Sequence, residues 1–225
     1  MKVFPTHKRW QLASAIFLAL IAGYVDGYGL LFLGTYVSFM SGNTTSMGLK
    51  SGQGNFQAAL SPAIAVLSFV AGSFVGNFLT KSKLAHSHRA IFGLIASLLA
   101  TVPGLEWLGY RNVSAEIVML CLAMGMMNPA LTKIGAESVS ITFMTGTLSR
   151  IGGHLAAAAV SEPLTAKDFP GDSHLNHART DAIVWSGFLL GAALSGMAHF
   201  HFQMWALLPP CVFMVGLALF SEAAA

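Results

Sequence analysis

Apolar residues dominate six stretches of the chain, each about as long as a membrane-spanning helix. A transmembrane helix needs roughly 20 consecutive, mostly apolar residues. Polar segments, which hold most of the charged residues, separate the stretches. The pattern predicts six transmembrane helices near the following ranges: Trp10–Leu31, Leu60–Leu79, Ala90–Leu108, Ala115–Thr132, Ala182–Phe200 and Gln203–Phe220.

Charged residues are too scarce to cover a soluble globular surface. Of the 225 residues, 55% are hydrophobic and 9% are charged. Soluble domains carry about 25% charged residues. We therefore expect an all-α polytopic membrane protein, with residues 1–225 forming one membrane domain in contact with the lipid bilayer. The net charge of +3 does not imply a nucleic-acid partner, because the basic residues lie between the apolar stretches.

Lysine and arginine residues are distributed unequally between the two predicted sides of the membrane. Only Lys50 and Arg111, out of 12 basic residues, lie on the side opposite to the termini. Loops rich in Lys and Arg stay in the cytoplasm, so both termini are expected to be cytoplasmic. The segment 161–181, which is rich in Asp, His and Pro, is then expected to be a cytoplasmic loop.

A short hydroxyl-rich phrase occurs twice, as SFMSGNTT at Ser38–Thr45 and as TFMTGTLS at Thr142–Ser149. A shift of 104 residues aligns the two phrases, and a shift of 102 places Asp26 on Asn128. Further along, a shift of 119 aligns the small residues of the second and fifth stretches. The alternative is a chance similarity between apolar segments, but the matched features also keep their order.

The repeat divides the chain into two halves, about 10–110 and 114–221, with three crossings each. Because three is odd, the second half enters the membrane from the opposite side. Two inverted halves related by an axis in the membrane plane are common in secondary transporters. The expected fold is therefore six transmembrane helices built as two inverted three-helix repeats.

Two longer segments resemble a known family. These are AGYVDGYGLLFLGTYVSFMSGNTT in the first half and MNPALTKIGAESVSITFMTGTLSRIG in the second. Together they are similar to the YoaK-like family of bacterial membrane proteins, and the resemblance covers nearly the whole chain. It implies a six-helix protein of the inner (plasma) membrane. It supplies no substrate.

Both halves weaken their first helix at matching positions. Asp26 lies among three glycines in GYVDGYG, and Asn128 is followed by Pro129, which opposes a continuous helix. We expect the first helix of each half to be broken there. The Ser, Thr and Asn residues that follow are good helix N-caps, so each phrase should begin a short helix with its free amides toward the protein centre. The segments 41–55 and 145–160 could be re-entrant or interfacial.

Polar residues near the two breaks form the candidate substrate-binding site. An ionised carboxylate inside hydrocarbon costs roughly 3 kcal/mol on insertion scales. Asp26 is therefore either a proton, cation or substrate site, or it has a structural role as a cap or a hydrogen-bond acceptor at the helix end. The candidate binding residues are Asp26, Ser41, Asn43, Thr44, Asn128, Thr145 and Thr147.

Two charged residues flank the second phrase on the predicted cytoplasmic side. Glu137 and Arg150 are candidates for a gate; an ordinary interfacial ion pair or two solvated charges are the alternatives. Histidines 174 and 177, with aspartates 172 and 181, form the best arrangement for a metal. Their spacing is not tight, and a solvated loop accounts for them better. We expect no metal site and no cofactor.

These features favour a small secondary transporter that works by alternating access around a polar site in mid-membrane. The substrate is expected to be a small polar or amphipathic metabolite, and a homodimer is plausible. One alternative is a structural or regulatory membrane protein. The other is an intramembrane enzyme using Asp26, Glu137 and His154, although no spacing marks these as a set. We expect that the protein is not an enzyme.

Overall fold

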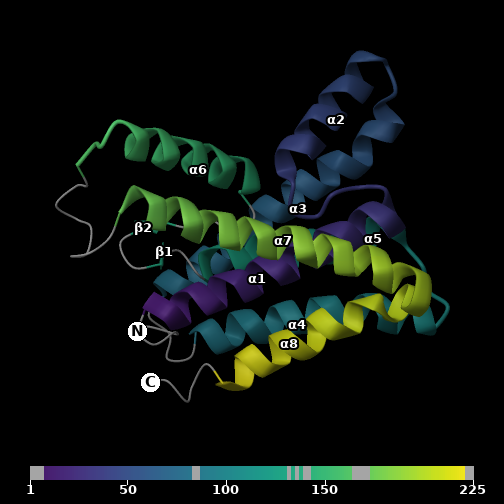
Figure 1. Cartoon of the computed structure of the whole chain (residues 1–225). Coiled ribbons are helices and arrows are strands. Elements are labelled where there is room, and N and C mark those ends of the chain that lie inside the picture. The colour runs from purple at the N-terminus through teal and green to yellow at the C-terminus, as the bar shows by residue number, and fades with distance from the viewer. Residues whose placement is uncertain are drawn as a thin grey trace.

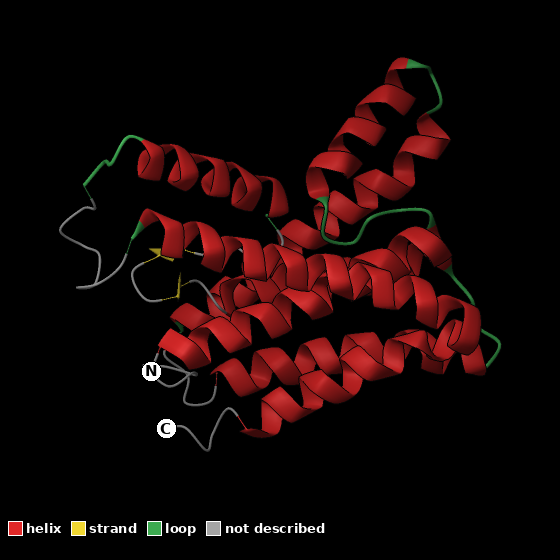
Figure 2. Cartoon of the chain, in the orientation of Figure 1, coloured by secondary structure: helices red, strands yellow, loops and turns green. Residues whose placement is uncertain are grey.

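A computed structural model describes residues 8–82, 87–130, 133–134, 137–138, 143–163 and 173–220. Within these residues the fold is helical apart from one pair of two-residue strands (Figure 2). The elements of the first half are α1 (Lys8–Tyr28), the π-helical turn η1 (Gly29–Leu33), α2 (Met40–Gly52), α3 (Phe56–Lys81) and α4 (Ser87–Trp107). Those of the second half are α5 (Val113–Met127), η2 (Asn128–Ala130), β1 (Lys133–Ile134), β2 (Glu137–Ser138), α6 (Met144–Ala159), α7 (His174–Phe202), η3 (Gln203–Leu207) and α8 (Leu208–Phe220).

Four of the described helices are long and apolar enough to cross a membrane: Gln11–Leu33, Phe56–Lys81, Ser87–Trp107 and His174–Phe202. They agree with the predicted helical membrane protein. Two further apolar helices, Val113–Met127 and Trp205–Leu219, lie in the other two predicted spans but are shorter. Six crossings therefore remain a prediction.

The long helices pair across the two halves of the chain. Helix α1 packs along α7, α5 packs along α3, and α4 packs along α8 (Figure 1). Buried aliphatic side chains from α1, α4 and α5 fill the space between these pairs, among them Leu18, Ile21, Ile95, Leu99 and Leu120. Within the described residues, the first helix of each half packs mainly along a helix of the other half.

Glycines allow the paired helices to approach closely. A side chain at Gly23 of α1 would meet the backbone of Phe188 in α7, and one at Gly125 of α5 would meet the backbone of Phe69 in α3. These are equivalent contacts, since the shifts of 102 and 119 convert the first pair of residues into the second. The reciprocal contacts correspond in the same way: Gly191 against Leu20, and Gly72 against Leu122.

The first helix does not break at Asp26, and that prediction is wrong. Helix α1 continues to Tyr28 and then through the π-helical turn to Leu33, because apolar residues follow the glycines without interruption. It ends at Gly34, which adopts a left-handed φ of 65° that glycine permits without strain. In the second half, α5 ends at Met127 and passes into a 3-10 turn at Asn128–Ala130, where Pro129 was expected to interrupt it.

Each repeated phrase begins a short helix, as predicted. Helix α2 turns back at Gln53–Asn55 and pairs with the start of α3, and this hairpin extends away from the bundle (Figure 1). Helix α6 lies alongside α7. The predicted loop 161–181 ends earlier than expected, because α7 already begins at His174.

Candidate functional site

The two short helices begin in the same way, but not with the caps that were expected. The N-cap residues are Phe39 (φ −84°, ψ 74°) and Phe143 (φ −91°, ψ 64°), and neither helix has a side-chain capping bond. In both, the ring folds over the glycine three positions later: a side chain at Gly42 or Gly146 would collide with it. This contact explains why each phrase has a Phe followed three positions later by a Gly. The prediction of Ser, Thr or Asn caps is wrong.

Asp26 holds the chain that leads into α2. Its carboxylate accepts hydrogen bonds from the backbone amides of Val37 (2.8 Å) and Ser38 (2.7 Å). The residue is 6% exposed. These contacts fit the interpretation of Asp26 as a structural hydrogen-bond acceptor. Its partners, however, lie in the loop that enters α2 and not at the end of its own helix α1.

Each short helix has one buried polar residue near its start, Asn43 in α2 and Thr147 in α6. The side-chain amide of Asn43 donates to the Tyr36 carbonyl oxygen at 2.7 Å. Thr147 stands at the equivalent place, and its hydroxyl donates to the Phe143 carbonyl oxygen at 3.2 Å. Thr44 is exposed, and its hydroxyl donates to the Met40 carbonyl oxygen at 2.8 Å.

The starts of α2 and α6 meet around one open cavity of about 390 Å³. This central cavity is lined from the first phrase by Ser38, Phe39, Met40 and Ser41, from the second by Phe143, Met144 and Thr145, and from α3 and η2 by Phe69 and Asn128. Of the predicted binding residues, Ser41, Asn128 and Thr145 line it. Asp26, Asn43 and Thr147 are buried but are not part of its lining, and Thr44 lies outside it.

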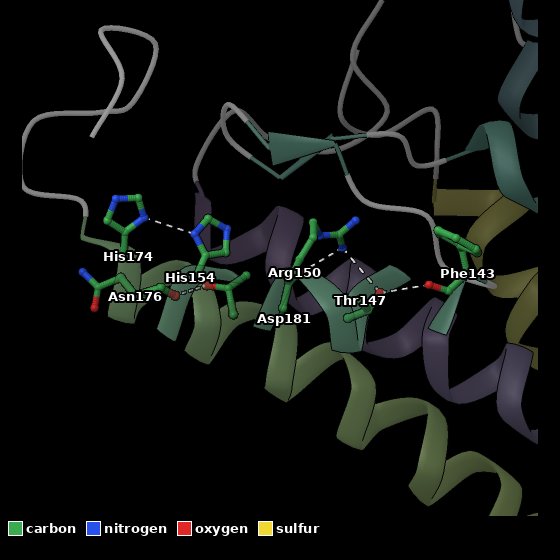
Figure 3. A network of polar contacts seen from close by, with 8 residues as sticks. Phe143, Thr147, Arg150, His154, His174, Asn176 and Asp181 are labelled. Atoms are coloured by element: carbon green, nitrogen blue, oxygen red, sulfur yellow. Dashed lines mark hydrogen bonds and ion pairs between the residues drawn. The ribbon is translucent and has the colours of Figure 1, made fainter. Parts of the chain in front are cut away.

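A polar network fastens α6 to α7 (Figure 3). Arg150 of α6 forms a bidentate ion pair with Asp181 of α7, with both N–O distances 3.0 Å. Asp181 is 1% exposed, while the Arg150 side chain keeps 33% of its surface exposed. The Arg150 guanidinium also donates to the Thr147 hydroxyl at 3.4 Å. Glu137, the other predicted gate residue, lies in β2, and its side chain is outside the described structure.

The histidines extend this network and are not solvated as the loop interpretation required. The Nδ1 atoms of His154 and His174 lie 3.2 Å apart, and the ring of His154 stacks on that of His177 with centroids 5.1 Å apart. His177 is buried. Asp172 lies outside the described residues. Within the described residues, no group of three or more His, Cys, Asp or Glu side chains is arranged to hold a metal ion.

Sequence reasoning missed the role of Asp181, but a local signal was available. Ser173 is the N-cap of α7, and its hydroxyl accepts from the Asn176 amide at 3.2 Å. Recognising this capping serine would have started the helix at His174. His177 and Asp181 would then have fallen on one helical face, four residues apart. Glu116, in the first turn of α5, is a second buried acid that was not anticipated.

A second cavity, of about 370 Å³, contains charged groups. It is lined by Phe32, Glu106, Arg111, His199, Phe200 and Gln203. Arg111 and Glu106 form a loose ion pair at 3.9 Å there, and the Arg111 side chain is 53% exposed. This cavity differs from the central cavity, whose lining has no charged side chain.

The two phrases and the helices that carry them lie within residues 14–220, and these match the family described as protein of unknown function (DUF1275). The chain belongs to this DUF1275 family. A UPF0700 transmembrane protein of Rhizobium meliloti (strain 1021) is 32% identical over 141 residues, which are 63% of this chain and 60% of that protein. The UPF0700 transmembrane protein YoaK of Bacillus subtilis (strain 168) is 26% identical over 211 residues, 90% of each chain. The expected YoaK-like membership is thus confirmed.

These relatives establish a DUF1275 membrane protein, in agreement with the apolar helices. The match spans less than two thirds of the length of the Rhizobium protein and nine tenths of the Bacillus one. No solved structure matches the chain.

Proposed function

We propose that this DUF1275 protein is a secondary transporter of the inner membrane, with the central cavity as its substrate site. The observation that carries the proposal is that two phrases about a hundred residues apart in the chain line one cavity. A scaffold has no need to bring two helix starts together around open space. A carrier does, because its substrate must be contacted by both moving parts.

The proposal includes six crossings arranged as two inverted repeats. The pairing of α1 with α7 and of α5 with α3 supports it, because a twofold axis in the membrane plane would exchange these two pairs. The equivalent glycine contacts support it as well, since they keep the same register in both halves. The excess of basic residues on one side supports cytoplasmic termini.

In the proposed mechanism, the two halves rock about the central cavity, which opens to one side of the membrane at a time. Ser41 approaches the substrate from α2 and Thr145 from α6, while Asn128 offers an amide from the turn after α5. The ion pair between Arg150 and Asp181 holds α6 against α7 in the state described here. We propose that this pair belongs to the gate, with Glu137 as a further member. The protein moves its substrate and does not transform it.

Alternating access can be tested without knowing the substrate. Ser41→Cys and Thr145→Cys would be labelled with a membrane-impermeant maleimide in right-side-out and in inside-out vesicles. The two natural cysteines, Cys121 and Cys211, are buried, so the wild-type chain is the blank. A carrier exposes each introduced cysteine to both sides in turn, and we expect labelling of both variants in both kinds of vesicle.

Thr45→Cys is the matched control, because Thr45 is exposed on α2 and does not line the central cavity. It should react from one side only. If Ser41→Cys and Thr145→Cys also reacted from one side only, the transporter proposal would fail. A structural or regulatory membrane protein would then be the better account of the fold.

A further inference from the structure

The second cavity lies at the end of the helix bundle opposite to the start of α1 and the end of α8 (Figure 1). Segments far apart in the chain supply its lining, namely η1, the end of α4, the turn between α4 and α5, the end of α7 and the start of η3. Neither repeated phrase contributes to it, whereas both line the central cavity. With the proposed cytoplasmic termini, this end of the bundle faces the outside.

Two opposite charges in this lining are poorly satisfied by each other. The Oε1 atom of Glu106 and the Nη1 atom of Arg111 lie 3.9 Å apart, which is beyond hydrogen-bond distance. Within the described residues, neither charged group makes a hydrogen bond. The Glu106 side chain is only 21% exposed, so water can replace only part of the missing bonds. A ligand with a donor for Glu106 and an acceptor for Arg111 would satisfy both groups.

A wall of aromatic rings stands beside the two charges. The rings of Phe32 and His199 meet edge to face with centroids 4.5 Å apart, and those of His199 and Phe200 with centroids 5.6 Å apart. Tyr28 stacks on Phe32 at 4.3 Å and supports the wall from α1. Rings in such an arrangement offer an apolar surface on which the nonpolar part of a ligand can pack.

Two further features of the lining support a binding role. The Nδ1 atom of His199 is buried and has no hydrogen-bond partner in the described structure, although buried polar atoms are nearly always bonded. Gln203 has φ 45° and ψ −123°, a backbone conformation that residues other than glycine rarely adopt. Backbone strain of this kind is concentrated at ligand-binding and active sites. Both features occur in the cavity that holds the two charges.

We propose that the second cavity binds a small zwitterion of the α-amino acid class with an apolar side chain. Its ammonium would bind Glu106 and its carboxylate Arg111. Because a single carbon joins these two groups in the ligand, they can reach protein groups that lie 3.9 Å apart. The four charges then alternate in sign around a ring, and each attracts both of its neighbours. The side chain packs on the aromatic wall, and the volume of about 370 Å³ is that of a small-molecule pocket.

A ligand with a single charge fits this cavity less well. An amine would bind Glu106 but would be repelled by Arg111, and a carboxylate would bind Arg111 but would be repelled by Glu106. Glu116, which is buried near both groups, adds a further negative charge. Of the two ligands with one charge, the amine should therefore bind better than the carboxylate.

Binding would be measured by calorimetry on the full chain in lipid nanodiscs at neutral pH, with empty nanodiscs as the blank. Four probes are compared: phenylalanine, phenylethylamine, which lacks the carboxylate, 3-phenylpropionate, which lacks the ammonium, and glycine, which lacks the apolar side chain. We expect phenylalanine to bind about tenfold more tightly than each of the others, because each of them loses one contact. The inference is overturned if phenylalanine does not bind, or if any of the other three binds as tightly.

Two variants assign each charge of the ligand to its partner. In Glu106→Gln, phenylalanine should bind no more tightly than 3-phenylpropionate. In Arg111→Gln, it should bind no more tightly than phenylethylamine but should keep its advantage over 3-phenylpropionate. Each result is a ratio measured within one variant, so a partial loss of folded protein does not change it.

Matched controls remove the same charges elsewhere. Glu162→Gln and Arg179→Gln alter exposed residues outside the cavity and should bind phenylalanine like the wild type. Unchanged preferences in both cavity variants would place phenylalanine elsewhere and overturn the inference. Equal weakening of binding in the controls would overturn it as well.

The inference does not depend on the proposed transport, because it concerns a different cavity. Calorimetry measures equilibrium binding, whereas the cysteine experiment measures access and requires no ligand. Selective phenylalanine binding together with one-sided labelling would keep this site and reject transport. Two-sided labelling without phenylalanine binding would keep transport and reject this site.

Discussion

The hairpin α2–α3 and the pair α6–α7 begin with the same phrase, yet they are held together differently. A turn of three residues, Gln53–Asn55, joins α2 to α3. Helices α6 and α7 are separated by a longer connection and are joined by the ion pair between Arg150 and Asp181. The positions equivalent to this pair in the first half are Ser46 and Pro62, which cannot form one.

Each of these two arms, α2–α3 and α6–α7, both shapes the cavity and holds its short helix against a longer one. What the two arms share, namely the phenylalanine N-cap, the glycine beneath its ring and the buried residue after it, shapes the cavity. What they do not share determines how each arm is fastened. A covalent turn cannot be released, whereas an ion pair can, so we expect α6 to separate from its neighbour more readily than α2.

The largest expected effect comes from breaking the α6–α7 ion pair. Arg150→Ala leaves the Asp181 carboxylate buried without its counter-charge, and we expect a loss of about 3 kcal/mol in the free energy of unfolding. Asp181→Ala should lose less, because Arg150 is partly exposed and can be hydrated. Chemical unfolding in detergent micelles, followed by circular dichroism, measures both.

Glu106→Gln is the control for this prediction, because it alters the looser pair with Arg111, whose side chain is largely exposed. We expect a change below about 1 kcal/mol there. Equal losses for Arg150→Ala and Glu106→Gln would show that the fastening of α6 does not depend on the ion pair.

An intermediate effect tests whether the two halves are packed equivalently. Gly23→Ala and Gly125→Ala each place a methyl group against the backbone of the facing helix, at Phe188 and Phe69 respectively. Because the contacts correspond, each variant should lose about 2 kcal/mol of stability, and the two losses should agree. Thermal and chemical unfolding of the two variants side by side provide the comparison.

Gly93→Ala serves as the reference, since a side chain at Gly93 of α4 meets nothing within 4 Å. It should gain up to about 1 kcal/mol from the better helix propensity of alanine. A loss in only one of Gly23→Ala and Gly125→Ala would argue against equivalent packing of the halves.

The smallest expected effect comes from exchanging a residue between the phrases. Asn43→Thr introduces the residue that stands at the equivalent position of α6, Thr147. The Tyr36 carbonyl oxygen then loses its amide donor, and we expect a loss of about 1 kcal/mol in unfolding free energy. Thr44→Val removes an exposed hydroxyl one position later and should change stability by less than half of that. An unchanged stability of Asn43→Thr would mean that α2 and α6 can exchange this residue freely.

Local patterns in the sequence were enough to predict the helical membrane class and the two short helices. Runs of apolar residues reveal spans because the bilayer excludes unpaired backbone groups, and Ser38–Thr45 and Thr142–Ser149 mark the same change of direction in each half. Conformations decided by tertiary contacts could not be predicted. The N-caps at Phe39 and Phe143 depend on ring packing, which overrides the capping preference of the hydroxyl residues beside them.

The same limit applies to charged groups. Asp26 was singled out because it interrupts an apolar stretch, yet its place behind the cavity depends on the path of residues 34–38. Asp181 was assigned to a loop because polar residues surround it in the sequence. It became buried because Arg150, 31 positions earlier, packs against it. Only the three-dimensional fold brings such a pair together.

The pairing of helices across the two halves of the chain has a consequence for biosynthesis. Helix α1 is made first, but its partner α7 begins roughly 150 residues later, a delay on the order of ten seconds or more at the usual pace of translation. During that interval the glycine face of α1 has only lipid or an insertion factor to cover it. If the two halves were expressed as separate polypeptides, the first helix of each would still require the other half as its packing partner. Their co-assembly in one membrane would show whether the covalent connection between the halves is required.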